Sequence, residues 1–402
     1  MKVLLVCPNR RTIPQWAPFF EGLAAQSDMS VHVLTSRMIP SRRHELETGG
    51  YYPGEYEMTE TGAVFQKLSE KGHSAPLVFA SGLNAVVREL GPDVVYIIGE
   101  PGYFSSWQTV RACQRYAPDA KTCSRQAQNI YKQWPFPFSY FERYCLQRID
   151  CVFANGRQQA EVLARKGYRG RVELMPLGVD STVFHRHEPD ALRVELGAQD
   201  AFLVGYVGKL TEAKGIADLL TAFRQLPETA QLLVVGTGEL GRMVADLADE
   251  PGLEKRVHWI KGVAHTELPR YLSAMDTLVL PSVEVRSSAV QRGVPIPWRE
   301  QFGRVLVEAM ACQVPIVGSS SGLIPEVIGE AGATFREGDV GDLVAKLLLA
   351  MNNDQWRERC ARDGLKQVKE KYSWHRICRR YAEVFRELVE ETRQPPEGRP
   401  IK

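Results

Sequence analysis

The sequence predicts an α/β protein made of two doubly wound domains, each with a parallel sheet between layers of helices. The chain has 402 residues, which suits two domains of about 150–200 residues better than one. Short runs rich in leucine and β-branched residues alternate with amphipathic segments, and the alternation starts afresh near residue 204. Buried strands that alternate with helices are typical of parallel sheets covered on both faces.

The first half of the chain supplies the strands of the first sheet, expected at residues 2–7, 30–35, 92–98, 150–154 and 171–176. Helices are expected between them at 16–25, 77–90 and 158–166. Residues 38–66 are polar and only weakly periodic, which predicts a long excursion or lid. Ligands of parallel sheets lie at the carboxyl ends of the strands, so the loops at 8–12, 35–38 and 99–102 are candidate contacts.

The second half repeats the alternation, with strands expected at 204–208, 231–236, 257–261, 276–281 and 315–318. Helices are expected from 215 to 224 and from 304 to 311. An amphipathic helix at 372–392 follows, and the Pro- and charge-rich tail from residue 394 is expected to fray.

Composition favours a soluble globular protein, with 44% hydrophobic and 24% charged residues. The formal net charge of +2 gives no basic excess for nucleic-acid binding. The eight cysteines form no CxxC pair, which favours reduced thiols in the cytoplasm. The apolar run at the N-terminus is too short for a signal peptide, and no run approaches the roughly 20 residues that span a bilayer. A cytoplasmic protein is expected.

The most informative stretch is Trp298 to Gly322, WREQFGRVLVEAMACQVPIVGSSSG. It contains Glu300 and Glu308, separated by seven residues, with Gly303 before a helix-forming run. A helix that begins after a glycine directs unpaired N–H groups and a partial positive charge outward, which suits a phosphate. The alternative is an ordinary helix–strand unit with two surface glutamates.

A second element with phosphate character joins a strand that ends at Gly208 to Lys209, Lys214 and Gly215, just before a helix. Two cations beside a glycine-opened helix suit a diphosphate. By themselves, two such lysines would more often be solvated surface charge. Gly236 and Gly238 form a further loop at a strand end.

The Glu-x7-Glu element continues into EAMAC-x-VP-x-VGS-x-SG-x-IPEVIGEAG, and together they resemble the retaining glycosyltransferases of family 4. The resemblance covers nearly the whole chain and is strongest over 204–338. It implies the GT-B fold, two Rossmann-like domains facing a central cleft. An acceptor-binding domain is then expected at 1–180 and a nucleotide-sugar domain at 185–372. A C-terminal helix at about 374–392 would cross back onto the first domain.

The resemblance also assigns roles to residues. Glu300, Lys209 and Lys214 are the expected catalytic residues, with Glu300 on a hydroxyl of the donor sugar and Glu308 on the ribose. The chain has no Asp-x-Asp motif and no His/Cys/Asp ligand cluster, so no metal or other cofactor is expected. The donor contacts are expected at Gly208, Gly236, Gly238, Val263, Gln301, Phe302, Gly303, Arg304, Val305 and Glu308.

The chain departs from the family pattern in three places. Lys209 stands where relatives have arginine, and lysine loses the bidentate hydrogen bonding. Asn9-Arg10-Arg11 replaces a Gly-Gly pair; the two arginines could face an anionic group or be solvated charge. Residues 120–130 lack the family's usual histidine near the anomeric carbon, for which Gln128 or Asn129 is a weak substitute.

Three further features stay open. Glu100 could bond a sugar hydroxyl or cap a helix. The basic and aromatic run 131–148 could contact a membrane interface or stack sugars, or it could be a Pro-rich turn with a partly buried helix. Residues 287–297 lengthen the usual connection to Glu300, which suggests a flap over the donor.

The expected function is hexosyl transfer from a nucleotide-diphosphate sugar to a hydroxyl acceptor, with retention of anomeric configuration. A UDP-sugar is favoured and GDP-mannose comes second. The acceptor, on the side of Asn9, Glu100, Gln128 and Asn129, could be a glycan, a lipid-linked precursor or a small metabolite. The alternatives are a non-catalytic nucleotide-binding partner subunit and an epimerase or phosphorylase with the same fold. The sequence names neither the linkage nor the oligomeric state.

Overall fold

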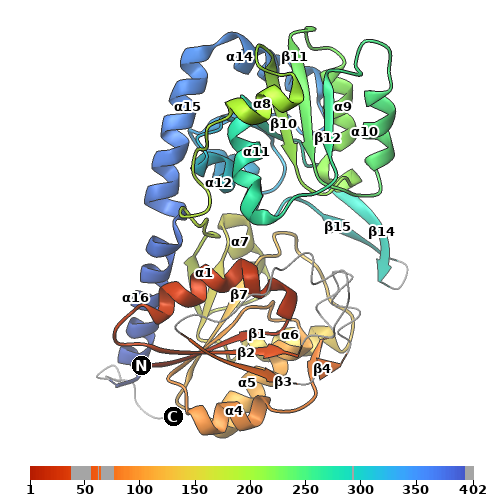
Figure 1. The fold of residues 1–402 in the computed structure, drawn as a ribbon. Coiled ribbons are helices and arrows are strands. Elements are labelled where there is room, and N and C mark those ends of the chain that lie inside the picture. Colours follow the sequence, from red (N-terminus) through yellow and green to blue (C-terminus); the bar gives the residue numbers. More distant parts are fainter. Residues whose placement is uncertain (38–55, 62, 65–76, 292–293, 394–402) are drawn as a thin grey trace. The chain divides into compact units, whose positions relative to one another are not determined.

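The computed structural model describes residues 1–37, 56–61, 63–64, 77–291 and 294–393. The chain divides into two compact units (Figure 1). Unit 1 consists of Met1–Pro176 together with Trp374–Lys402, and unit 2 is Leu177–Ser373. The division falls between Pro176 and Leu177, against an expected first boundary near residue 180.

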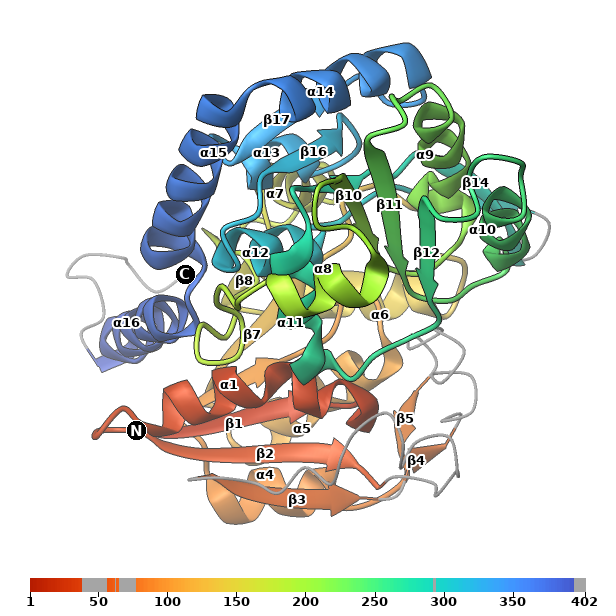
Figure 2. The ribbon, with the colours of Figure 1, turned by 45° about the horizontal axis from the view of Figure 1, so that its top comes forward.

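Unit 1 contains a seven-stranded sheet in the order β3-β2-β1-β6-β7-β8-β9, and every pairing in it is parallel. Figure 2 shows β1, β2 and β3 side by side. The strands are β1 (Lys2–Cys7), β2 (Ser30–Ser36), β3 (Glu57–Thr61), β6 (Val94–Ile97), β7 (Lys121–Gln126), β8 (Cys151–Ala154) and β9 (Arg171–Leu174); a separate antiparallel pair joins β4 (Ala63–Val64) and β5 (Val78–Phe79).

Helices cover both faces of this sheet because its strands are apolar on both sides. Leu4 and Val6 of β1 share a core with Val87 and Val110 from α4 and α5. Side chains alternate between the two faces along a strand, so Tyr96 of β6 points to the opposite face, where it packs against helices α1 and α16. The helices of unit 1 are α1 (Ile13–Ala24), α4 (Leu83–Leu90), α5 (Phe104–Tyr116), α6 (Phe138–Leu146), α7 (Arg157–Arg165) and α16 (Trp374–Arg393), with a 3₁₀ turn η1 (Arg10–Thr12) before α1.

Helix α16 follows unit 2 in the sequence but belongs to the core of unit 1. The ring of Tyr381 stacks on Phe153 of β8 with the centroids 4.2 Å apart, and its hydroxyl lies 3.0 Å from that of Tyr96. On the surface, Arg386 forms an ion pair with Asp28 at 2.7 Å. Burial of this aromatic cluster therefore attaches the last helix to the first sheet.

Unit 2 contains a six-stranded parallel sheet in the order β12-β11-β10-β13-β16-β17. Figure 2 shows β12, β11 and β10 side by side. The strands are β10 (Phe202–Val207), β11 (Ala230–Val235), β12 (Val257–Ile260), β13 (Thr277–Leu280), β16 (Ile316–Ser319) and β17 (Gly332–Phe335). An antiparallel hairpin, β14 (Val285–Gln291) with β15 (Val294–Trp298), follows β13.

The sheet of unit 2 also lies between two helical layers. Helices α9, α10 and α14 pack on the face that carries Val204 and Tyr206, and α8, α11, α12 and α13 pack on the face that carries Leu203 and Leu278. These helices are α8 (Asp190–Leu196), α9 (Ile216–Phe223), α10 (Gly241–Ala248), α11 (Leu268–Ala274), α12 (Arg304–Ala311), α13 (Ile324–Ile328) and α14 (Val340–Asn352). The unit is completed by α15 (Asp354–Gln367), a π-helical turn η4 (Val368–Tyr372) and 3₁₀ turns η2 (Glu212–Lys214) and η3 (His265–Glu267).

The predicted fold class is confirmed, and two element predictions in unit 1 are wrong. Residues 77–90 do not form one helix, because β5 takes Val78–Phe79 and α4 begins only after Gly82. The side-chain amide of Gln108 both donates to and accepts from the backbone of Phe79, and Gly82 has φ +82°, so the chain turns there. Part of the expected excursion at 38–66 belongs to the sheet as β3; residues 38–55, 62 and 65–76 lie outside the described residues.

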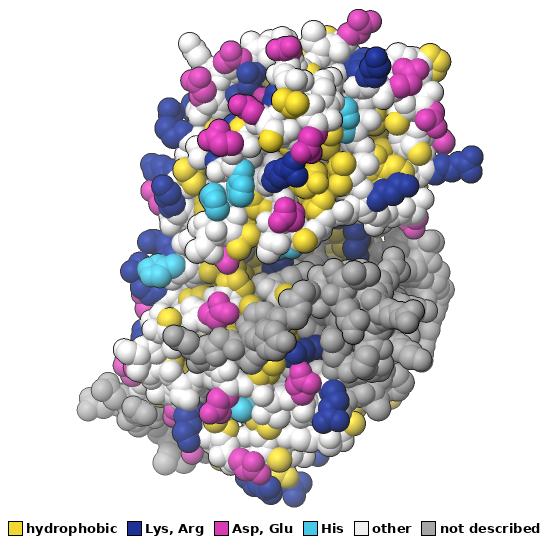
Figure 3. All heavy atoms as spheres, in the orientation of Figure 1, with side chains coloured by type: hydrophobic (Ala, Val, Ile, Leu, Met, Phe, Trp, Pro, Cys, Tyr) yellow, Lys and Arg dark blue, Asp and Glu magenta, His cyan; other side chains and the backbone are white. Residues whose placement is uncertain are grey.

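Charges on the surface are mixed. On the face that Figure 3 shows, lysine and arginine side chains are interspersed with carboxylates over unit 2. All eight cysteines are buried free thiols. Within the ranges that the structure describes, no helix is long and apolar enough to cross a membrane.

Candidate active site

The start of helix α12 has the geometry that the sequence predicts for a phosphate site. Gly303, the residue before the helix, has φ +75°, and a Cβ there would lie 2.8 Å from Leu280 and 2.9 Å from Leu306. Only glycine fits this left-handed and crowded position. Phe302 is buried and packs against Tyr372, and the half-buried Arg304 and Val305 begin the helix. The first-turn N–H groups of α12 thus have a fixed direction.

Glu300 lies beside this helix start and holds a lysine. Its Oε2 accepts a hydrogen bond from Lys214 Nζ at 2.5 Å and another from the Ser282 hydroxyl at 2.9 Å. Glu300 is 6% exposed, so the carboxylate is nearly removed from water. Residues 86 apart in the sequence therefore form one charge-assisted contact, which joins two of the three predicted catalytic side chains.

The two glycine loops of unit 2 meet through their backbones. Gly236 has φ +142°, and a Cβ on it would lie 1.9 Å from the carbonyl oxygen of Gly208. A Cβ on Gly238 would lie 2.2 Å from the carbonyl oxygen of Leu210, whose N–H donates to Thr237. The loops after β10 and β11 thus run in backbone contact, and a side chain at either glycine would separate them.

Lys209, the third predicted catalytic residue, is not part of the Glu300 contact. Its side chain is exposed and forms no ion pair with any described residue, whereas its carbonyl oxygen accepts a hydrogen bond from the Tyr206 hydroxyl. The ammonium group is accordingly available to an anion at the end of β10.

Glu308 lies in the second turn of α12 and is 5% exposed. Its Oε1 lies 3.0 Å from Nε2 of His265, which is part of η3 after β12 and packs against Phe184. Val263, from the same loop, is half-buried against the core, and Gln301 is half-buried beside Glu300. The carboxylate that the sequence assigns to the ribose therefore faces the loop that ends β12.

Three contacts of this site were not predicted from the sequence. Ser282 and His265 could have been suspected, because each follows a predicted strand of the second domain and such strand ends carry ligand contacts. Trp298, whose ring lies 5.0 Å from Lys214 Nζ, has no such signal. No group of three or more His, Cys, Asp or Glu side chains among the described residues is arranged to hold a metal ion.

In unit 1, Glu100 follows β6 and bonds to the loop after β7. Its Oε1 accepts hydrogen bonds from the N–H groups of Ala127 at 2.8 Å and Gln128 at 3.0 Å. Desolvation raises the pKa of the Glu100 carboxyl, while these two bonds and the charge of Arg125 act in the opposite direction. Glu100 caps no helix; it connects the ends of two strands.

The other acceptor-side candidates also have structural partners. Arg10 forms an ion pair with Glu60 of β3 at 3.0 Å and its side chain is only 19% exposed, so of the two alternatives for this position solvated charge is wrong. Asn9 accepts from Thr12 through its carbonyl oxygen, and the buried Asn129 donates to Gln158 at 3.1 Å.

The segment 131–148 is a loop followed by the partly buried helix α6, as expected for a Pro-rich turn with a partly buried helix. Phe141 packs edge-on against Phe104, with the centroids 4.7 Å apart. Phe136 and Tyr140 stay exposed, by 75% and 49%, and are the only exposed aromatic side chains among the described residues. Arg148 lies over the ring of Tyr144.

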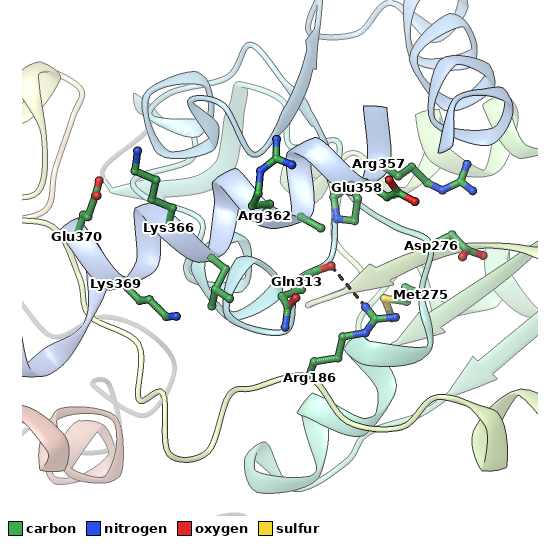
Figure 4. A pocket seen from close by; sticks show the side chains of 13 residues that line it. Arg186, Met275, Asp276, Gln313, Arg357, Glu358, Arg362, Lys366, Lys369 and Glu370 are labelled. Atoms are coloured by element: carbon green, nitrogen blue, oxygen red, sulfur yellow. Dashed lines mark hydrogen bonds between the residues drawn. The ribbon is translucent and has the colours of Figure 1, made fainter. Parts of the chain in front are cut away.

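A separate cavity of about 660 Å³ lies in unit 2 along α15 (Figure 4). Arg186 points to the carbonyl of Gln313 there, and Lys369 lies on the other side of Gln313. None of the predicted donor residues lines this cavity.

Both halves of the chain match known family models. One described as glycosyl transferases group 1 matches residues 189–367, and one described as a glycosyl transferase 4-like domain matches residues 16–178. The two matches fall on the two structural units in turn, so each unit has the architecture of a glycosyltransferase domain. The chain belongs to the family 4 type of glycosyltransferases with the GT-B fold.

Similar curated proteins include O-antigen chain mannosyltransferase B of Escherichia coli, 30% identical over 42% of this chain and 42% of that protein. D-inositol 3-phosphate glycosyltransferase of Mycolicibacterium smegmatis is 29% identical over 50% of this chain and 45% of that protein. The matched part thus spans less than half the length of these relatives.

Solved structures with the same fold cover nearly the whole chain. Sucrose-phosphate synthase from Thermosynechococcus elongatus has a TM-score of 0.68 and 20% identity over 97% of this chain and 99% of that one. Anabaena HepE in complex with UDP has a TM-score of 0.69 and 18% identity over 96% and 99%.

Proposed function

We propose that the protein is a retaining glycosyltransferase that moves a hexosyl unit from a nucleotide-diphosphate sugar to a hydroxyl acceptor. The proposal rests on one observation, the contact between Lys214 and the nearly buried Glu300. This contact lies beside the start of α12, where Gly303 is the N-cap. A lysine held next to outward-directed N–H groups suits a diphosphate whose negative charge grows as a bond to it breaks.

Each residue of the site has a distinct task in this proposal. The Lys214 ammonium, the exposed Lys209 and the first-turn amides of α12 stabilise the leaving diphosphate. Glu300 orients the donor sugar through a hydroxyl while it also positions Lys214. Glu308 accepts hydrogen bonds from the ribose hydroxyls. The acceptor hydroxyl attacks from the face that the diphosphate leaves, and a leaving phosphate oxygen takes its proton, which retains the anomeric configuration.

The donor proposed first is a UDP-sugar, with GDP-mannose second. A structure of the same fold, HepE, was solved in complex with UDP-glucose, whereas one curated relative is a mannosyltransferase. The proposed chemistry needs no metal, because Lys209, Lys214 and the helix start supply the positive charge. Addition of EDTA should therefore leave the transfer rate unchanged; a loss that Mg²⁺ or Mn²⁺ restores would contradict this part.

The test is a thermal-shift screen with UDP, GDP and ADP and their sugar conjugates, followed by measurement of nucleotide release. Binding to the folded state raises the melting temperature by mass action. We expect one nucleotide to stabilise the protein and its sugar conjugate to be consumed in the presence of an acceptor. Stabilisation without consumption would favour a non-catalytic partner subunit, and consumption without acceptor dependence would favour an epimerase.

A second proposal concerns the exposed aromatic side chains of unit 1. We propose that Phe136 and Tyr140, with the exposed Arg143 of α6 and the exposed Arg148 just after it, contact an anionic membrane surface. Phe136→Ser/Tyr140→Ser should reduce cosedimentation with vesicles that contain phosphatidylglycerol. The matched control changes two exposed apolar residues of unit 2, Met243→Ser/Leu349→Ser. Equal sedimentation of both double variants would contradict the proposal.

A further inference from the structure

The hairpin β14–β15 separates two segments that both contact Lys214 or its loop. Before the hairpin, Val283 N–H donates to the Ala213 carbonyl at 3.0 Å. Trp298 is the last residue of the hairpin, at the end of β15, and Glu300 follows two residues later. Arg299 and Glu284, on opposite sides of the hairpin base, form an ion pair at 3.6 Å. The inserted hairpin thus begins and ends against the turn that carries the proposed catalytic lysine.

The turn itself is held rigidly. Gly215, which follows Lys214, has φ +64°, and a Cβ there would lie 1.8 Å from the carbonyl oxygen of Pro281. The backbone of the turn is therefore in direct contact with the segment that leaves β13. What the backbone does not fix is the side chain of Lys214, which has four rotatable bonds and is 23% exposed.

Two groups hold that side chain. The Glu300 carboxylate accepts from Nζ at 2.5 Å, and the half-buried Trp298 presents its ring 5.0 Å from the same nitrogen. A cation within about 6 Å of a tryptophan ring centre is attracted to the negative face of the ring. The two contacts differ in one respect: the carboxylate offsets the charge of the ammonium group, whereas the neutral ring does not.

We propose that Trp298 is a positioning residue of the donor site that holds the Lys214 ammonium in place for the leaving diphosphate. The inference rests on the proposed glycosyl transfer. If Glu300 were the only group that held Lys214, the Lys214 ammonium would lose its orienting contact when it left the carboxylate to bind a phosphate. With the ring in place, Lys214 exchanges one anionic partner for another while it stays over Trp298. In this proposal the hairpin positions the Trp298 ring beside the Lys214 ammonium.

The test replaces Trp298 with phenylalanine or leucine and, separately, with tryptophans that carry one, two or three fluorines on the ring. Fluorination weakens the attraction of the ring for a cation and changes its shape little. We expect Trp298→Leu to lower kcat about tenfold, Trp298→Phe to lower it less, and the fluorinated series to lower it stepwise. KM for the acceptor should change less than twofold in each.

Trp107 of unit 1 is the matched control, because its ring also lies 5.0 Å from a cation, that of Arg111. The same fluorinated series at position 107 should leave kcat unchanged. Melting temperatures identify variants that fail to fold. If fluorination at position 298 leaves kcat unchanged while Trp298→Leu lowers it, Trp298 acts through packing alone and the inference is overturned. If the wild-type protein transfers no sugar, the proposed function itself fails.

Discussion

The two units use polar groups at their strand ends in different ways. In unit 2, Lys214 and Glu300 come from distant parts of the chain and meet at a helix start, where the Glu300 carboxylate is nearly removed from water. In unit 1, Glu100 bonds to two backbone amides and Arg10 pairs with Glu60 of β3, so these charges complete the fold around them.

The glycines explain much of this difference. At the strand ends of unit 2, Gly208 and Gly236 let two loops approach through their backbones, and Gly303 opens a helix. Unit 1 has Asn9 and Arg10, which both carry side chains, after its first strand. Where two loops of a site lie in backbone contact, glycines must stand at the points of contact, and glycines can be located in a sequence. A site made from side chains depends on partners that only the folded chain brings together.

The largest expected effect is at Lys214. Lys214→Ala should lower kcat by about 10²–10³-fold, because a preorganised positive charge at the leaving group is lost. Affinity for the nucleotide, measured by calorimetry, should fall much less. Lys255→Ala removes an exposed lysine of the same unit and should leave both quantities unchanged. If the kcat of Lys214→Ala stayed within threefold of the wild-type value, Lys214 would have no catalytic role, and the contrast between a catalytic pair in unit 2 and structural charges in unit 1 would fail.

The close backbone approach in unit 2 can be tested with two glycines of similar φ. Gly236 has φ +142° and Gly262 has φ +148°, but only at Gly236 would a Cβ meet a neighbour, the Gly208 carbonyl. Gly236→Ala should lower the free energy of unfolding by about 2–4 kcal/mol, and Gly262→Ala by about 1 kcal/mol from the backbone alone. Chemical denaturation measures both. Equal losses would show that the close approach contributes nothing.

A smaller effect is expected at Glu308. Glu308→Ala should weaken nucleotide binding about tenfold, the loss expected for hydrogen bonds to a charged acceptor. Glu267→Ala removes an exposed carboxylate from the nearby turn η3 and serves as the control. Titration with UDP measures the difference, and unchanged affinity in Glu308→Ala would contradict the assignment of this carboxylate to the ribose.

The fold and the elements that carry the candidate site of unit 2 could be predicted from the sequence because their signals are local. Alternating buried strands, the glycine before α12 and the spacing of Glu300 and Glu308 are all read within short windows. The pairing of Lys214 with Glu300 could not, since it joins residues 86 apart whose two loops are brought together by the sheet. The contact of Trp298 with Lys214 was hidden for the same reason. The partner of Arg10 could not be predicted, because Glu60 lies on a strand that the sequence did not predict.

The smallest effect should appear at Glu100, where pH separates a structural role from a role in binding. The pKa of this carboxyl is raised by desolvation, so the folded state binds its proton more readily than the unfolded state does. The stabilisation linked to that proton is present at low pH and is lost as the pH rises through the raised pKa. Above the raised pKa the ionised Glu100 therefore carries a penalty, which Glu100→Gln removes while it keeps an oxygen for the N–H groups of Ala127 and Gln128.

Glu100→Gln should accordingly be more stable than wild type at a pH above the raised pKa, and the advantage should shrink as the pH falls below it. Glu100→Ala loses both hydrogen bonds and should be destabilised by about 1–3 kcal/mol at either pH. Melting temperatures measured over this range give the stability, and acceptor KM gives the binding role. A raised KM in Glu100→Gln together with unchanged stability at both pH values would mean that the carboxylate serves the acceptor. Unit 1 would then carry a side-chain site comparable to that of unit 2.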